Sequence, residues 1–273
     1  MSLLVKAARE AATIASVTPA SAGWRYVGFE AVRLAEGESI ERRFDGEEMC
    51  MVVVSGCVTL QTTSDNETAT HQWEKLFSRH SPFDDTAPYA LYAPPRTAVR
   101  ATAHGAVELA ICTAPAQGIF ATRLIKPAQL ASTQRGVAAN TRYVRDILPQ
   151  SAPAESLLVV EVRTPSGHSS SYPPHKHDAD SIPTESALEE TYYHRVEPPQ
   201  GFVVQRVYTD ERDLDEIMSV EDRDVVMVPR GYHPVIVPYG YESYYLNVMA
   251  GPRRAWHFRN DPAHEWMIDA PPR

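Results

Sequence analysis

Four side chains in the second half of the chain have types and spacing that suit a metal site. His175 and His177 are one residue apart, Glu190 comes thirteen residues after His177, and His233 follows a Pro-Arg-Gly turn later on. Alternate side chains of a β-strand share a face, so the first two histidines can face one ion together. Three imidazoles and a carboxylate suit zinc, iron, manganese or nickel and leave positions for water or substrate.

Two local features bear on this predicted site. The pair Pro173-Pro174 lacks backbone N–H donors and stiffens the approach to the histidines, which suits the edge of a sheet. The sequence "LEETYY" offers two neighbouring carboxylates. Glu189 therefore stays an alternative to Glu190 as the carboxylate ligand.

Short β-strands must position these ligands, because the chain contains 22 prolines and many short β-branched runs between turn residues. This punctuation predicts an all-β protein built as a sandwich or barrel. The strands expected in the first half are Trp24–Leu34, Met49–Thr62, Tyr89–Pro95, Thr97–Ala103 and Val107–Ala114. Those expected in the second half are Ser156–Thr164, Glu190–Val196, Gly201–Thr209, Asp224–Pro229, His233–Pro238 and Glu242–Gly251.

The two halves repeat one order of features. A proline turn, "APPRT" or "VPRGYH", is followed by a closing strand that ends "CTAPA" or "VMAGP". We therefore predict two consecutive β-barrel or jelly-roll domains with few short helices, at residues 1–120 and 156–273. The connector, 121–155, is expected to hold a short helix around Pro127–Leu130. The acidic stretch Glu211–Ile217 is expected to form a short solvated helical turn.

Composition narrows the classes of partner. The net charge of −9, from 26 Lys and Arg against 35 Asp and Glu, disfavours nucleic acid and anionic membranes. Three cysteines with no CxxC pair indicate a reducing compartment. Lys6, Arg9 and Glu10 interrupt the apolar N-terminal stretch, and no later apolar run reaches about 18 residues. We expect a cytoplasmic protein that acts on a small molecule, with no membrane or nucleic-acid partner; a homo-oligomer is compatible with this.

The strings that carry the predicted ligands resemble a known family. "HKH", a glutamate that opens an aromatic strand, and "PRGYH" are similar to the two motifs of the cupin superfamily, and the double layout is similar to a bicupin. More narrowly, "SSYPPHKHD", "LEETYYHRV", "VPRGYHPV" and "YYLNVMAGP" together resemble the 5-deoxyglucuronate isomerase family of myo-inositol catabolism. "GWRYVGFE" and "SPFDDTAPYALYAPP" extend the resemblance into the first half, which has no matching histidines. The resemblance implies that the metal ligands are His175, His177, Glu190 and His233.

The same resemblance implies the reaction. 5-Deoxy-D-glucuronate becomes 2-deoxy-5-keto-D-gluconate when a proton moves between neighbouring carbons through an enediolate, with a divalent metal as Lewis acid. Zinc is the first choice of metal, with manganese, iron or nickel as alternatives. A hydride shift is the alternative route. The alternative functions are a related uronate ketol-isomerase acting on pectin breakdown products, an iron-dependent cupin dioxygenase, or a non-catalytic sugar-binding module.

Further residues are needed to move the proton and hold the substrate, because a metal-ligating glutamate is not a free base. The candidates for proton transfer are Glu242, Tyr245 and His257. Arginine can clamp a uronate carboxylate with two parallel hydrogen bonds, and a strand tyrosine can present its hydroxyl to a sugar. The candidates for substrate binding are Arg195, Arg230 and Tyr193.

Overall fold

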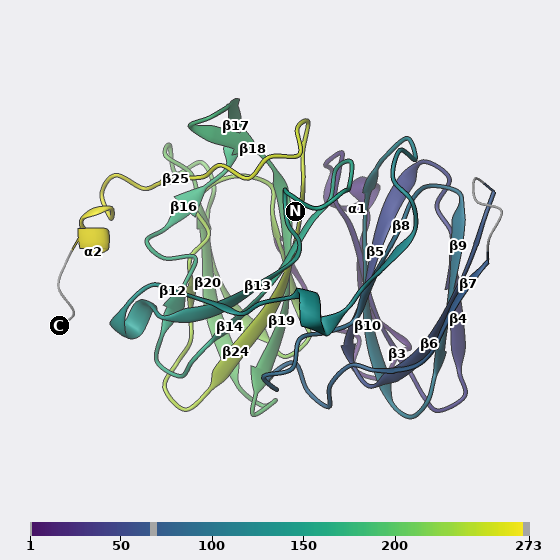
Figure 1. The fold of residues 1–273 in the computed structure, drawn as a ribbon. Coiled ribbons are helices and arrows are strands. Elements are labelled where there is room, and N and C mark those ends of the chain that lie inside the picture. The colour runs from purple at the N-terminus through teal and green to yellow at the C-terminus, as the bar shows by residue number, and fades with distance from the viewer. Residues whose placement is uncertain (1, 66–69, 270–273) are drawn as a thin grey trace. The chain divides into compact units, whose positions relative to one another are not determined.

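The computed structural model describes residues 2–65 and 70–269, and these residues form two compact β units. One, here called the histidine unit, comprises the chain up to Ala7, residues 132–145 and the chain from Val160 onward. The other, here called the aliphatic unit, comprises Ala8–Ala131 and Asp146–Val159. Arrows dominate the ribbon of each unit (Figure 1), so the all-β prediction is confirmed.

Helices are few and short in the described part of the chain. The α-helices are α1 (Pro19–Ala22) and α2 (Trp266–Asp269), and the 3-10 helices are η1 (Pro127–Gln129) and η2 (Ala138–Asn140). The helix expected around Pro127–Leu130 is thus present as η1. No helix among these residues is long and apolar enough to cross a membrane.

The two units are not contiguous in sequence, unlike the expected domains 1–120 and 156–273. The N-terminal strand β1 (Leu4–Val5) pairs with β22 (Val225–Val228) and so belongs to the histidine unit. The expected connector contains three strands and is divided between the units: β11 (Arg123–Ile125), β12 (Thr133–Arg135) and β13 (Arg142–Leu148). The aromatic and aliphatic residues of "RYVRDIL", of which Val144, Ile147 and Leu148 are buried, are the local signal for the last of these.

In the histidine unit, a seven-stranded sheet has the order β1-β22-β19-β24-β14-β13-β12, and a four-stranded sheet has the order β15-β23-β20-β21. The further bounds in the large sheet are β14 (Leu158–Thr164), β19 (Glu189–Glu197) and β24 (Glu242–Ala250). In the small sheet they are β15 (Ser169–Ser170), β20 (Phe202–Tyr208), β21 (Asp215–Glu221) and β23 (Val235–Ile236). Two strand pairs complete the unit: β16 (His175–Lys176) with β25 (Arg259–Asn260), and β17 (Asp178–Ser181) with β18 (Glu185–Ala187).

The helical turn expected at Glu211–Ile217 is wrong for its last residues. Asp215 already belongs to β21, which pairs with β20 along its whole length. Met218 and Val220 are buried on this strand, whereas Asp215, Ile217 and Ser219 are exposed. Pairing with β20 overrides the local acidic composition, which alone resembled a solvated turn.

In the aliphatic unit, a six-stranded sheet has the order β11-β8-β5-β10-β3-β2, and a four-stranded sheet has the order β4-β9-β6-β7. The bounds in the first are β2 (Thr13–Val17), β3 (Gly28–Leu34), β5 (Glu47–Ser55), β8 (Ala90–Ala93) and β10 (Val107–Pro115). In the second they are β4 (Ser39–Arg42), β6 (Cys57–Ser64), β7 (His71–Phe77) and β9 (Thr97–Ala103). The strand expected over Met49–Thr62 is therefore two strands. Gly56 separates them at φ 98°, where an added Cβ would lie 2.4 Å from the Ala106 carbonyl oxygen.

Candidate metal centre

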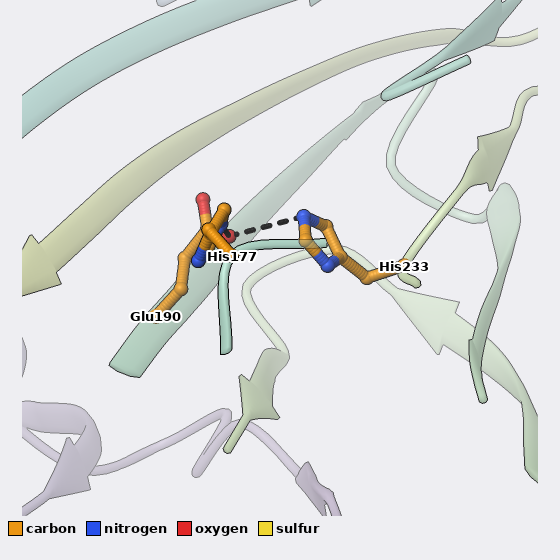
Figure 2. A group of neighbouring side chains, drawn as sticks. All are labelled: His177, Glu190 and His233. Carbon is orange, nitrogen blue, oxygen red and sulfur yellow. Dashed lines mark hydrogen bonds and ion pairs between the residues drawn. The ribbon is translucent and has the colours of Figure 1, made fainter. Parts of the chain in front are cut away.

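Three of the predicted ligands meet in the interior of the histidine unit. His177 Nε2 lies 3.0 Å from Glu190 Oε2, and His233 Nε2 lies 3.3 Å from the same oxygen. Figure 2 shows both dashed lines ending at this carboxylate. One ligand atom from each residue lies within 4.8 Å of the other two, and all three residues are buried.

Each ligand is positioned by a different part of the fold. Glu190 is the second residue of β19, where it pairs with Val228 on one side and Met249 on the other. His177 directly follows β16. His233 follows Gly231, whose φ of 90° and whose approach to the backbone of β20 exclude a side chain: an added Cβ would lie 2.5 Å from the Tyr208 carbonyl oxygen.

The donor atoms of this cluster fit a divalent cation. Nδ1 of His177 lies 3.2 Å from the Leu188 carbonyl oxygen, and Nδ1 of His233 lies 2.8 Å from that of Gly231. A carbonyl only accepts hydrogen bonds, so each Nδ1 carries a hydrogen, and in the neutral ring Nε2 is the atom whose lone pair can bind a metal. His233 Nε2 is buried and makes no hydrogen bond with any residue that the structure describes. Lone pairs that converge on a carboxylate in a buried space are the donor set of a metal centre.

Burial and charge act differently on the two histidines. Burial lowers the pKa of His233 to about 3, although the charge of Glu190 opposes this, so the ring stays neutral as a ligand must. Burial also acts to lower the pKa of His177. Its hydrogen bond to Glu190 and the charge of that carboxylate outweigh burial, and the pKa of His177 is raised.

The fourth predicted ligand lies beside the compact group of three. The His175 ring centre is 4.9 Å from that of His233 and 6.3 Å from that of His177. Burial lowers the pKa of His175 to about 3. Of the two neighbouring glutamates, the structure brings Glu190 to the cluster. Glu189 is the preceding strand residue and points to the other face.

A cavity of about 40 Å³ adjoins the cluster, and the inner face of the seven-stranded sheet forms much of its wall. On β19 and β24, Tyr192 is paired with Asn247, and Tyr245 lies two pairs further along, opposite His194. These three residues line the cavity together with Glu190 and His175. Among the candidates for proton transfer, Tyr245 is therefore at the site, with its ring centre 4.9 Å from that of Tyr192.

The structure does not bring Glu242 to the cluster. It pairs with Glu197 at one end of the ladder between β19 and β24, whereas Glu190 pairs with Met249 near the other end. Seven residues of strand separate the two ends, roughly 23 Å at the usual rise per residue. Its carboxylate lies 3.1 Å from Arg163 Nε. Glu242 thus lies on a strand that lines the cavity, but at the end of that strand far from the cluster.

The remaining candidates also have other surroundings, and none belongs to the described lining of the cavity. Arg195 Nε donates to Asp222 Oδ1 at 2.8 Å. The Tyr193 side chain is buried on the face of β19 opposite Tyr192. Arg230 donates to both carboxylate oxygens of Asp213, at 3.0 and 2.8 Å. The main-chain N–H of His257 donates to Ser186 Oγ at 3.1 Å.

Two arginines and a tryptophan of the cavity were missed: Arg135, Arg142 and Trp256. The arginines lie in the expected connector, 121–155, for which the sequence predicts only a short helix around Pro127–Leu130. Arg142 and Val144 are two residues apart, and this spacing places their side chains on the same face of a strand. Nothing in the sequence alone indicates that this strand joins the sheet that carries Glu190.

The chain matches known proteins over nearly its whole length. The model of the KduI/IolB family matches residues 3–267. A 5-deoxy-glucuronate isomerase of Geobacillus thermodenitrificans (strain NG80-2) is 48% identical over 261 residues, which are 96% of this chain and 93% of the relative. Another of Bacillus subtilis (strain 168) is 48% identical over 254 residues, 93% of this chain and 92% of the relative.

Solved structures give the same assignment. An IolB-like protein from Salmonella typhimurium LT2 superposes with a TM-score of 0.94 at 46% identity, covering 98% of this chain and all of that one. Lactobacillus farciminis oxalate decarboxylase, a formate complex, has a TM-score of 0.68 at 12% identity, covering 99% of this chain and 91% of that one. This second likeness shows a shared fold and confirms the bicupin prediction. The chain belongs to the KduI/IolB family.

Proposed function

We propose that the protein is an aldose–ketose isomerase that converts 5-deoxy-D-glucuronate to 2-deoxy-5-keto-D-gluconate, a cytoplasmic step of myo-inositol catabolism. Relatives named 5-deoxy-glucuronate isomerase support this, at 48% identity over 96% of the chain. The observation that carries the proposal is the convergence of buried donor atoms from His177, Glu190 and His233 beside a cavity lined by phenol and guanidinium groups. A ketol isomerisation needs these groups, because charge develops on oxygen while a proton moves.

The proposed metal ligands are His177, Glu190 and His233, with His175 as the fourth. Zinc is the first choice for such a set, and manganese, iron and nickel are the alternatives. When bound, a divalent cation supplies a Lewis acid that withdraws electron density from the carbonyl and neighbouring hydroxyl oxygens of the sugar. The cavity residues that are not proposed metal ligands can then act on the substrate itself.

The phenols of Tyr245 and Tyr192 are proposed to handle protons at the substrate oxygens. Burial raises the pKa of both. Each Oη therefore holds its proton at neutral pH and can donate a hydrogen bond to an oxygen that gains negative charge. Ser171 Oγ lies 3.0 Å from Tyr192 Oη and orients that hydroxyl. Glu242 and His257 lie outside the cavity lining and have no part in this scheme.

The test is an assay of the purified protein with 5-deoxy-glucuronate, paired with elemental analysis. We expect turnover that a chelator abolishes and that added metal restores. Turnover of a pectin-derived uronate alone would change the substrate, and consumption of O₂ would indicate a dioxygenase. Ligand binding without turnover, insensitive to chelator, would indicate a sugar-binding module.

A second measurement separates the two routes of the isomerisation. In the enediol route, the proton that leaves carbon can exchange with solvent before carbon is protonated again, so in D₂O deuterium enters the product. A hydride shift keeps the original hydrogen. Size-exclusion chromatography of the same sample tests the homo-oligomer, which stays a prediction.

A further inference from the structure

Two arginines face each other across a hairpin at the edge of the large sheet. β12 and β13 pair antiparallel, with Arg135 directly opposite Arg142. Both residues line the cavity that Glu190 and His175 also line. Directly opposed side chains have Cβ atoms about 5 Å apart, and like charges at such a pair destabilise the sheet. An anion between the two guanidinium groups would remove this repulsion.

Arg142 donates its hydrogen bonds to uncharged groups in the described part of the chain. Its Nη1 donates to the main-chain oxygen and to Oδ1 of Asn140, both at 3.1 Å, and both acceptors are uncharged. Within residues 2–65 and 70–269, no Asp or Glu forms an ion pair with it. Burial lowers the pKa of Arg142; Tyr245 and Tyr192 oppose this, and the charge of Arg135 adds to it.

Other arginines of the same sheet are compensated. They have acidic partners at short range: Arg145 with Glu161 at 3.2 Å, Arg163 with Glu242 at 3.1 Å, and Arg195 with Asp222 at 2.8 Å. A partly buried cation without such a partner is costly unless a ligand supplies the negative charge. Arg142 is therefore set apart by its surroundings as well as by its place in the cavity wall.

We propose that Arg142, with Arg135, binds the carboxylate of the sugar-acid substrate. This inference rests on the proposed function. The two oxygens of a carboxylate match the fork of a guanidinium group, and one carboxylate can be shared by two of them. The cluster of His177, Glu190 and His233 would then hold the reacting carbonyl end while the arginines hold the acid end. The pair would make the enzyme select aldehyde acids over neutral sugars.

The two arginines differ in how firmly the fold holds them. Arg142 lies on β13, between β12 and β14, whereas Arg135 lies on β12, the edge strand of the sheet. The Arg135 guanidinium carbon is 5.7 Å from the centre of the Trp256 ring. A cavity of about 40 Å³ is far smaller than the 300–1,000 Å³ usual for ligand sites, so its wall must move to admit a six-carbon acid. Arg142 supplies the half of the carboxylate site that lies on an inner strand, and Arg135 the half that lies on the edge strand.

Arg142→Met tests the proposal in the metal-loaded, full-length protein. We expect the KM for 5-deoxy-glucuronate to rise at least about 30-fold, with kcat changed only a few fold and metal content unchanged. Arg142→Lys keeps the charge but loses the fork, so its KM should rise by a smaller factor. Arg206→Met is the matched control, since Arg206 pairs with Asp215 at the surface; its KM should stay that of the wild type.

A neutral analogue sharpens the result. In 5-deoxyglucose a primary alcohol replaces the carboxylate, and the wild type should discriminate strongly against it. Arg142→Met should lose most of this preference, which a purely structural role would not change. The inference is overturned if the lysine variant and any folded methionine variant, both with full metal content, keep the wild-type KM and preference. Failure of the wild type to convert 5-deoxy-glucuronate would instead contradict the proposed function.

Discussion

Glu190 of the histidine unit and Met49 of the aliphatic unit occupy the same place in two similar ladders. Each pairs with the last residue of a neighbouring strand, just before a proline: Glu190 with Val228, and Met49 with Ala93. On the other side, each is flanked by a long antiparallel strand, β24 or β10. The backbone position is shared, but one side chain is a carboxylate, the proposed metal ligand, and the other is the thioether of a methionine.

The difference between the units continues along the inner faces of β5 and β19. After Met49, Met51 and Val53 belong to the aliphatic core, which also holds leucines and valines of both sheets. After Glu190, the corresponding positions hold Tyr192 and His194. At these positions the aliphatic unit has methionine and valine where the histidine unit has carboxylate, phenol and imidazole groups, so one fold provides a core in one unit and a polar site in the other.

The turn that leads to the third ligand shows the same division. Gly231 has φ 90° and Arg96, after the equivalent proline turn, has φ 62°. Two residues later the histidine unit has His233 and the aliphatic unit has Ala98. The left-handed turn is thus common to both units, and only one of them uses it to present an imidazole.

A second carboxylate shows what distinguishes a metal donor from a structural anchor. Glu48, on the other face of β5, accepts hydrogen bonds from Tyr92 Oη at 2.7 Å and from the main-chain N–H groups of Glu155, Ser156 and Leu157 at 2.8, 2.6 and 2.6 Å. These donors satisfy its lone pairs. Glu190 instead lies 3.0 and 3.3 Å from the Nε2 atoms of two histidines, and a cation would complete such a set.

The largest effect is expected from Glu190→Gln. Loss of the anionic ligand should remove most bound metal and lower kcat/KM at least about 1,000-fold, because an amide is a weaker donor and carries no charge. Elemental analysis and the isomerase assay measure both. Met49→Leu at the equivalent position is the control and should leave metal content and activity unchanged. Normal metal content in the glutamine variant would exclude Glu190 as a ligand.

The reciprocal exchange, Met49→Glu, should destabilise the aliphatic unit by more than about 3 kcal/mol, because it buries a charge with no partner. Chemical denaturation against Met49→Leu gives the difference in the free energy of unfolding. The variant should gain no metal, since Ala98 stands where His233 stands in the other unit. Added bound metal in the glutamate variant would contradict the comparison.

Glu48→Gln should cost about 1.5–3 kcal/mol of unfolding free energy, because hydrogen bonds to a charged acceptor become neutral ones and the amide nitrogen faces main-chain donors. Metal content should not change. Equal stability of the variant and the wild type would show that the carboxylate is not an anchor.

Asp178→Asn should weaken metal affinity about 10- to 100-fold, as is usual for residues that orient ligands. Asp178 Oδ2 accepts from the Gly231 N–H at 2.8 Å, and its Oδ1 accepts from Lys176 Nζ at 2.7 Å, so it joins the segments that carry His177 and His233. Titration with metal measures the affinity. Asp213→Asn, which breaks an exposed ion pair with Arg230, is the control and should leave it unchanged.

The smallest effect concerns pH. Burial lowers the pKa of His194 to about 4, while the unfolded side chain titrates near its ordinary value of 6.5. The unfolded state therefore binds more protons, and the stability that neutral His194 provides falls as pH drops from about 6.5 to 4. Val53 stands at the equivalent position of the aliphatic unit. His194→Val should reduce the dependence of the unfolding free energy on pH by up to about 1.4 kcal/mol per pH unit. Parallel stability curves of the metal-free proteins would contradict this.

Much of the metal centre was predictable because its ligands stand in short local patterns. The histidine pair, the glutamate at the head of an aromatic strand and the glycine turn before His233 are each visible within a few residues. The substrate end was not predictable in this way. Arg142 carries no local signal of function, and Glu242 lies on the correct strand but seven residues from the correct end. Arg195 and Arg230 have the residue type of a carboxylate-binding site, but each forms an ion pair with an aspartate that is distant in the sequence.

The sequence by itself determined which atoms could bind a metal, and through the two-residue period of a strand it determined which neighbours share a face. Only the tertiary structure decided which faces meet. Pairing between strands is a long-range choice of partner and register, and a change of either moves a side chain by several ångströms or to the opposite face. That choice placed Arg135 and Arg142 in the wall beside Glu190, and it left the matching wall of the other unit filled with hydrocarbon.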